Sequence, residues 1–141
     1  QQRDITFNNE PRNYVLYVPD TAKTPAPMIL LLHGSFGSAA GITALWKADA
    51  DANGIVLVAP TSRIISGWNI IGDHPDFLRA AILDAATQHP IDPRRMYLFG
   101  QSGGAVYALN IAMLESQYFA CVAWLAGAWR KPEEFQFMNY A

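Results

Sequence analysis

The sequence has few of the features that mark several classes of protein. Its 141 residues include one cysteine, Cys121, so no disulfide can form within the chain and the redox compartment cannot be deduced from cysteine use. Charged residues make up 16%, the net charge is -2 and no basic run stands out, which argues against a nucleic-acid partner. Apolar runs such as residues 28–32 (MILLL) are far shorter than the ~20 residues that span a bilayer, so no membrane partner is expected.

What the sequence does have is enough apolar material for one folded domain. Hydrophobic residues make up 51% of the chain, which is typical of a globular protein with a buried core. The length suits one modest domain, so residues 1–141 are predicted to form a single domain. The chain begins with Gln1 and shows no signal-peptide pattern, which leaves the compartment open.

Short apolar runs alternate with amphipathic segments along the chain. The runs predict a strand over 14–18 and buried strands over 28–32, 55–59, 96–99 and 121–125, and the amphipathic segments predict helices over 38–53, 76–88 and 103–115. Residues 61–72 are predicted to form a polar loop and 91–95 a turn. This alternation predicts an α/β fold, a mostly parallel central sheet with helices on both faces. Ligands bind such sheets beyond the carboxyl ends of the strands, near segments 34–37, 61–72, 101–104 and 126–130.

The most informative stretch places one serine between glycines. Gly100-Gln101-Ser102-Gly103-Gly104 fits the G-x-S-x-G pattern, and it lies between a predicted strand and a predicted helix. In that context the turn is sharp, and small residues two positions before and after the serine leave room for it. We therefore predict that Ser102 is a nucleophile and that the Gly103 N–H stabilises an oxyanion. Gln101, beside the nucleophile, is a predicted substrate contact.

Two nucleotide-binding interpretations fit these glycines less well. A dinucleotide-binding turn requires G-x-G-x-x-G, and a P-loop requires a Gly-Lys-Ser/Thr sequence; neither is present. A flavodoxin-type domain requires a phosphate-binding first loop, and the candidate at 34–37 has no basic residue nearby. No cofactor is expected.

A second motif follows the first central strand directly. The motif is His33-Gly34-Ser35-Phe36-Gly37. Where a serine nucleophile lies in a strand–turn–helix of this type, the loop after this strand supplies the second amide of the oxyanion hole. The Ser35 N–H is the predicted donor, with the Phe36 N–H as the alternative. His33 is predicted to brace loops through hydrogen bonds rather than to act as a base. No metal site is expected, because no further ligands stand at metal spacing.

These motifs, in this order, resemble those of the α/β-hydrolases, and more narrowly of esterases similar to polyhydroxybutyrate depolymerases and feruloyl esterases. Further matching stretches are 12–19 (RNYVLYVP), 67–69 (GWN), 76–78 (DFL) and 91–97 (IDPRRMY), so the resemblance covers most of residues 12–128. It implies a serine esterase, often secreted or periplasmic, that acts on hydroxyalkanoate or hydroxycinnamate esters, as small molecules or polymers. It also implies that Trp68 and Asn69 lie near the active site and bind substrate. The alternative is an ordinary loop with one aromatic anchor.

The rest of a catalytic triad is missing from its expected place. In this fold the chain order is serine, acid, histidine, yet no Asp and no His follow Ser102. The acids after it are Glu115, Glu133 and Glu134, and the histidines are His33, His74 and His89, all before the serine. His74 is the one considered as a replacement base. We therefore expect the chain to be the N-terminal part of a longer enzyme that stops after the strand following the nucleophile helix, with the triad Asp and His outside it.

Two functions follow from these observations. The first is a carboxylic-ester hydrolase that forms an acyl-enzyme at Ser102. The second is a non-catalytic module or inactive fragment that keeps the hydrolase half-fold for binding or assembly, possible because the acid and base are absent. The resemblance implies two further strands after strand 121–125; without them that strand leaves an open edge, for which a second chain or a dimer partner is the alternative cover. The aromatic residues Phe36, Trp68 and Trp129 either line a substrate site or serve as packing anchors.

Overall fold

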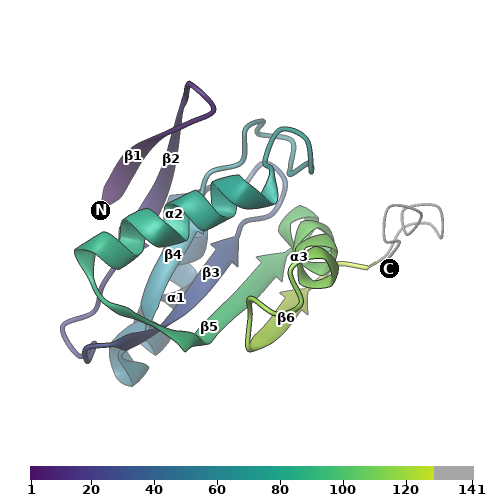
Figure 1. The fold of residues 1–141 in the computed structure, drawn as a ribbon. Helices are drawn as coiled ribbons and strands as arrows, with labels where there is room; N and C mark the ends of the chain where they lie inside the picture. Colours follow the sequence, from purple (N-terminus) through teal and green to yellow (C-terminus); the bar gives the residue numbers. More distant parts are fainter. Residues whose placement is uncertain (129–141) are drawn as a thin grey trace.

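The computed structural model describes residues 1–128, which form one six-stranded sheet and three helices (Figure 1). The elements, in chain order, are β1 (Gln2–Phe7), β2 (Glu10–Tyr17), β3 (Ala26–Leu32), α1 (Ala39–Asn53), β4 (Val56–Pro60), α2 (Pro75–Gln88), β5 (Ile91–Gln101), α3 (Gly103–Leu114) and β6 (Cys121–Leu125).

The strand order brings the two predicted site loops together. The sheet runs β1-β2-β4-β3-β5-β6, in which β4, β3, β5 and β6 are parallel, β2 pairs antiparallel with β4, and β1 pairs antiparallel with β2. This confirms the predicted, mostly parallel sheet. Leu32 at the end of β3 pairs with Gly100 near the end of β5. The loop after β3 and the turn after β5 therefore leave the sheet side by side.

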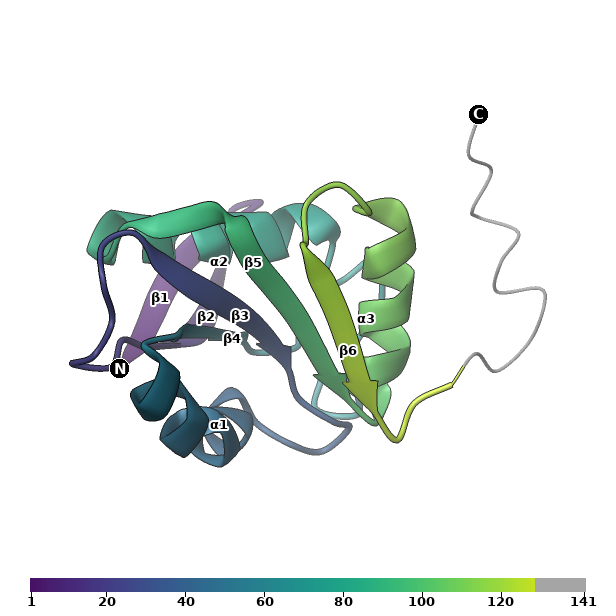
Figure 2. The ribbon, with the colours of Figure 1, turned by 90° about the horizontal axis from the view of Figure 1, so that it is seen from below.

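Helices cover both faces of the sheet, as predicted. α1 packs on one face against apolar residues of β3 and β4, while α2 and α3 pack on the other (Figure 2). The central strands are apolar on both sides: residues 30–32 and 56–59 are fully buried. Ser38 caps the start of α1 by accepting from the Gly41 N–H at 3.0 Å, and Gly54, with φ 65°, ends that helix. The core thus sits on both sides of β3 and β4 and fixes the strand ends that carry the loops.

One strand was not predicted from the sequence, and the start of another was predicted as a turn. β1 was not predicted, although Asn8 and Asn9, with φ of 50° and 61°, form the tight turn that joins it to β2. The pair Asn-Asn between two alternating segments was the available signal. The turn predicted over 91–95 is wrong, because Ile91 already pairs with Ala26 and β5 runs from there. Asp92 accepts from the Arg94 N–H at 2.9 Å and holds this irregular part of the strand.

The prediction that residues 121–125 form a buried strand is half wrong. β6 forms and pairs in parallel with β5, but most of its side chains are exposed. Among residues 1–128, β6 has a neighbouring strand on one side only, and α1 covers β3 and β4 rather than β6. The apolar composition of residues 121–125 therefore predicted the strand correctly but predicted its burial wrongly.

Candidate active site

Ser102 occupies the sharp turn between β5 and α3. Its φ of 52° and ψ of -116° lie in a region that residues with a Cβ rarely adopt. The Ser102 N–H donates to the Leu125 carbonyl of β6 at 2.8 Å, and its carbonyl accepts from the Ala105 N–H at 2.9 Å. Its side chain is exposed and makes no capping hydrogen bond. The turn therefore holds the backbone in a strained conformation and leaves the hydroxyl accessible.

The two outer glycines of the motif are required by close backbone contacts. A Cβ on Gly100 would lie 2.6 Å from the carbonyl carbon of Gly104, and a Cβ on Gly104 would lie 2.5 Å from the His33 carbonyl oxygen. Both distances are shorter than real Cβ contacts. The start of α3 consequently packs directly on the ends of β5 and β3, as a nucleophile turn requires.

The loop after β3 lies against Ser102 and the start of α3. A Cβ on Gly34 would lie 3.2 Å from the Ser102 Cβ, and a Cβ on Gly103 would lie 3.2 Å from the Ser35 nitrogen. Phe36, with φ 60°, donates its N–H to the Ile65 carbonyl at 2.7 Å. The N–H groups of Ser35 and Gly103 have no acceptor among residues 1–128. Two unpaired amides thus lie close together beside the serine, while the Phe36 amide is already occupied.

His33 is buried and braces this loop, which confirms its predicted role. The Ser62 N–H donates to Nε2 at 3.3 Å, so that nitrogen is unprotonated and Nδ1–H donates to the Gly34 carbonyl at 2.8 Å. Both ring nitrogens of His33 are therefore engaged in holding loops, and neither is free to take a proton from Ser102.

Trp68 is a packing anchor for the connection between β4 and α2. Its indole N–H donates to the His33 carbonyl at 2.8 Å, and its ring lies between the rings of His33 and Tyr107, with centroids 5.0 and 5.5 Å away. Asn69 is exposed, and its side-chain oxygen accepts from the Gly72 N–H at 2.6 Å within the same turn. The contacts of Trp68 are therefore those of a packing anchor. Substrate binding by Trp68 and Asn69 stays a prediction. Gln101, the last residue of β5, is half-buried and pairs with Leu125 of β6.

A buried ion pair that the sequence analysis missed lies under this connection. Arg12 of β2 is 7% exposed, Asp73 is 0% exposed, and Nη2 donates to the carboxylate at 2.7 Å. The same carboxylate accepts from the backbone N–H of Arg63 at 2.7 Å and of Asn69 at 3.1 Å. The Arg12 guanidinium also lies 3.7 Å from the centre of the Phe77 ring. Arg12 lies between Pro11 and Asn13 in the sequence, a context that gives no signal of a buried ion pair.

The hydroxyl of Tyr107 on α3 completes this cluster by donating to the Asp73 carbonyl. Burial is the main reason that the pKa of Tyr107 is raised well above its usual value. Tyr107 therefore stays protonated and acts as a donor at physiological pH. The cluster joins β2, α3 and the connection 61–74 in one hydrogen-bonded network.

The other candidate acids and bases are engaged elsewhere or lie beyond the described residues. His74 precedes α2, where Nδ1 accepts from the Asp76 N–H at 3.2 Å, and His89 ends the same helix. Trp129, Arg130, Glu133 and Glu134 lie outside residues 1–128, so what the sequence predicts for them stays a prediction. Among residues 1–128, no group of three His, Cys, Asp or Glu side chains is placed to hold a metal ion. The helices of that same part of the chain include none that is long and apolar enough to cross a membrane.

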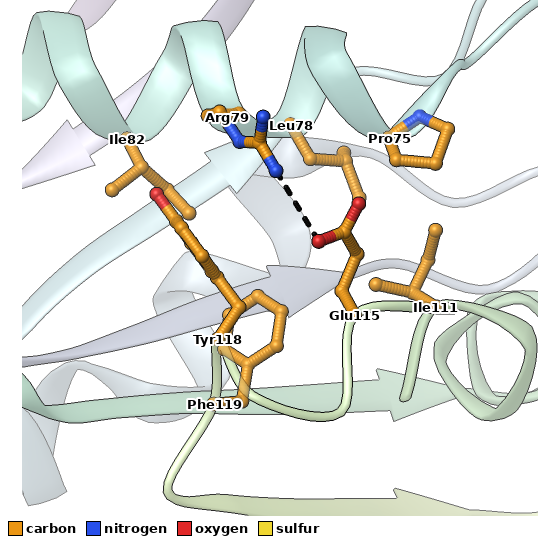
Figure 3. Close-up of a pocket in the computed structure, with 8 residues that line it drawn as sticks. All are labelled: Pro75, Leu78, Arg79, Ile82, Ile111, Glu115, Tyr118 and Phe119. Atoms are coloured by element: carbon orange, nitrogen blue, oxygen red, sulfur yellow. Dashed lines mark hydrogen bonds and ion pairs between the residues drawn. The ribbon is translucent and has the colours of Figure 1, made fainter. Parts of the chain in front are cut away.

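Glu115 forms the rim of a separate hollow between α2 and α3. The hollow is open to solvent and is lined by Pro75, Leu78, Arg79, Ile82, Ile111, Glu115, Tyr118 and Phe119 (Figure 3). Glu115 accepts from Arg79 at 3.2 Å across it. Since Glu115 faces this hollow and pairs with Arg79, it is not oriented as a partner for a base at Ser102.

Comparison with known proteins places these features in context. No family model matches the sequence. A curated protein, "Putative esterase NocK" from Nocardia uniformis subsp. tsuyamanensis, is 30% identical over 145 residues, which covers 92% of this chain and 42% of that protein. The chain therefore spans less than half the length of this curated relative.

Solved structures of esterases superpose on the chain. An acetyl xylan esterase from Aspergillus awamori matches 94% of this chain and 56% of its own, with a TM-score of 0.72 and 15% identity. The poly(3-hydroxybutyrate) depolymerase LpqC from Bordetella parapertussis matches 86% of this chain and 50% of its own, with a TM-score of 0.70 and 20% identity. A ferulic acid esterase matches 86% of this chain and 57% of its own, with a TM-score of 0.66 and 17% identity. Each match covers about half of the solved chain. At these identities the likeness establishes the fold, and residues 1–128 have the α/β-hydrolase fold that the motifs predicted.

Proposed function

We propose that this chain carries the nucleophile and the oxyanion hole of a serine hydrolase that cleaves carboxylic esters. The observation that carries the proposal is the turn at Ser102, which is strained, exposed and flanked by the amides of Ser35 and Gly103, neither of which has an acceptor among residues 1–128. A purely structural turn has no need of this strain, and strained backbone concentrates at functional sites.

The proposed chemistry follows from this arrangement. The Ser102 Oγ forms a bond to the ester carbonyl carbon, while its proton passes to a general base. The negative charge that develops on the carbonyl oxygen is stabilised by the N–H groups of Ser35 and Gly103. The intermediate collapses, the alcohol leaves with the proton from the base, and water then hydrolyses the acyl-enzyme by the same route.

The base and its orienting acid are proposed to lie outside residues 1–128. Within that range both ring nitrogens of His33 are engaged, while His74 and His89 sit at the two ends of α2. The fold's chain order also places the acid and the histidine after the serine. Because the chain spans about half the length of its relatives, the complete catalytic unit is a proposal about the whole protein.

An apolar group on the substrate is proposed from the side chains beside the serine. Phe36 is 75% exposed and Ile65 is 70% exposed, and the backbone hydrogen bond between them places both next to Ser35. Exposed apolar side chains at a candidate site suit a ligand with an apolar part. An ester with an aromatic or aliphatic acyl group fits, in line with the hydroxycinnamate and hydroxyalkanoate esters that the resemblance implies.

The test is labelling by a fluorophosphonate probe, which forms a stable bond only with an activated serine. The polypeptide from its native source is labelled and its intact mass is recorded, together with Ser102→Ala and, as a matched control, Ser116→Ala on the exposed α3–β6 connection. We expect one label per chain in the unmodified protein and in Ser116→Ala, and none in Ser102→Ala. Labelling that persists in Ser102→Ala would contradict the assignment.

One observation favours the alternative of a non-catalytic module: among residues 1–128 no histidine is free beside Ser102. The same experiment separates the two functions. Absence of labelling in a polypeptide whose mass is about 15.6 kDa supports the module, because its hydroxyl is then presented but not activated.

A further inference from the structure

The connection 61–74 touches the loop after β3 at three points. The Ser62 N–H donates to His33 Nε2 at 3.3 Å, and the Trp68 indole N–H donates to the His33 carbonyl at 2.8 Å. The Ile65 carbonyl accepts the Phe36 N–H at 2.7 Å. The position of residues 62–68 therefore determines the position of residues 33–36.

The third of these contacts orders the oxyanion donors. Phe36 has φ 60°, which is unfavourable for a residue with a bulky aromatic side chain. Its hydrogen bond to Ile65 offsets that cost, and the turn that results brings the Ser35 nitrogen next to Gly103. If Ile65 moved, the Phe36 amide would be released and the Ser35 amide would lose its fixed direction.

The connection itself has little regular structure to hold it. It contains one isolated bridge, between Ile64 and Gly67, and four exposed isoleucines. The carboxylate of Asp73 holds it by accepting hydrogen bonds from the N–H groups of Arg63 and Asn69, on either side of the loop. Arg12 in turn donates to this carboxylate. Arg12 also donates to the carbonyls of Thr61 and Gly72, at 3.0 Å each, which are close to the two ends of the connection.

We propose that Arg12 and Asp73 are positioning residues for the oxyanion hole, which act through the connection 61–74 on the amides of Ser35 and Phe36. The role of these amides as an oxyanion hole rests on the proposed function. The mechanical link, by which the ion pair positions the loop after β3 through the connection 61–74, rests on the observed contacts alone. A buried ion pair adds little stability over apolar residues of the same size, so stability is a weak reason for one here. A carboxylate and a guanidinium supply what apolar side chains cannot, which is directed hydrogen bonds to four loop groups: the carbonyls of Thr61 and Gly72 and the N–H groups of Arg63 and Asn69.

The test replaces the ion pair by a neutral pair of similar shape, Arg12→Gln with Asp73→Asn. The matched control is Arg3→Gln with Asp84→Asn, which removes another Arg–Asp contact from the same side of the sheet, at 2.6 Å, away from the connection. Amide hydrogen exchange is followed by NMR in the 141-residue chain. We expect exchange of the Phe36 amide to speed up about tenfold or more, as for loss of one hydrogen bond, and the Ser35 and Gly103 resonances to shift. Core amides of Leu30 and Val58 should keep their protection.

The control should leave Phe36 protected. Faster exchange at Arg63 and Asn69 with an unchanged Phe36 amide would overturn the proposal, because the pair would then hold only its own loop. If the double variant does not fold, Arg12→Lys decides by the same criterion, since it keeps the charge but loses the fork that reaches Thr61 and Gly72.

A second readout concerns the chemistry at Ser102. In the native polypeptide, the rate of fluorophosphonate labelling should fall at least tenfold in Arg12→Lys and stay within twofold in the Arg3 and Asp84 control. An equal labelling rate in Arg12→Lys would overturn the link to the oxyanion hole. Failure of the unmodified protein to be labelled would instead contradict the proposed function, and the exchange result would still decide the mechanical link.

Discussion

At the scale of single residues, Ser102 combines an accessible hydroxyl with a backbone that favours glycine. Its φ of 52° is maintained by the Leu125 carbonyl on one side and by the first turn of α3 on the other. Conformations of this kind cost about 1–3 kcal/mol per residue and persist only where the surroundings impose them. The serine is therefore a local source of instability, whose presence must be explained by something other than folding.

This strain predicts that Ser102→Gly stabilises the protein. Glycine adopts the observed φ and ψ freely, so relief of strain should exceed glycine's entropic cost and raise the free energy of unfolding by about 1 kcal/mol. Urea unfolding followed by circular dichroism measures it. Ser102→Ala is the matched control, because alanine also lacks the hydroxyl but keeps the Cβ. Equal stability of the two variants would show that the turn is not strained by its Cβ.

The features around the candidate site differ in how far apart in the chain the residues that produce them lie. The sharp turn at Ser102 was predicted, because the need for small neighbours is set within five residues of chain. Arg12 and Asp73 were not, because their pairing joins positions 61 residues apart and neither has a local motif. The occupied Phe36 amide was likewise invisible, since its acceptor, Ile65, belongs to a loop with no periodic pattern.

At the scale of elements, one polar cluster ties the N-terminal hairpin to α2. Arg3 of β1 contacts the carboxylate of Asp84 at 2.6 Å, and the Tyr14 hydroxyl of β2 donates to the same carboxylate at 2.6 Å. The hydrogen bond from Arg3 is the main reason that the pKa of Asp84 lies below its usual value, followed by that from Tyr14 against the opposing effect of burial. The hairpin is thus attached to the rest of the fold partly by a charge that acid removes.

The lowered pKa of Asp84 predicts an acid-sensitive contribution to stability. Because the folded pKa is below the unfolded value of about 3.9, the contribution is complete above that pH and is lost as the pH falls through the folded pKa. Asp84→Asn should therefore be less stable than the parent at pH 7, with a difference that shrinks steadily below about pH 4. Thermal unfolding from pH 7 to pH 2.5 measures it. Asp49→Asn, at an exposed position on α1, should follow the parent throughout. A constant difference between Asp84→Asn and the parent over this range would contradict the prediction.

Elements were predicted where their pattern is strong. The helices and the four central strands have buried runs or clear periodicity, and their observed bounds differ from the predicted ones by a few residues. β1 escaped because its burial alternates only between exposed and half-buried positions, which leaves a weak signal. The start of β5 escaped because Pro93 and Asp92 are turn residues in most contexts, and pairing with Ala26 overrides them.

At the scale of the whole molecule, the described sheet is asymmetric at its two edges. The β1 edge is polar and carries Gln2 and Asp4, whereas β6 has Trp124 and Leu125 exposed by 51% and 57%. Among residues 1–128 nothing pairs with the outer side of β6. Exposed apolar edge strands pair readily with other chains. This is the physical basis for the expected partner at that edge, and the sequence indicated it only through the apolar composition of the strand.

The exposed edge predicts that the 141-residue chain self-associates in solution, and that Leu125→Lys weakens the association. Two copies that meet at β6 would bury the apolar side chains there, and a lysine at Leu125 would place two like charges in that contact. We expect the dissociation constant to rise about tenfold or more in Leu125→Lys, measured by analytical ultracentrifugation over a range of concentrations. Leu83→Lys is the matched control, because Leu83 on α2 is 59% exposed and lies away from β6, so the same change of residue should leave association unaltered. An equal effect of both substitutions would mean that net charge, rather than pairing at β6, governs association.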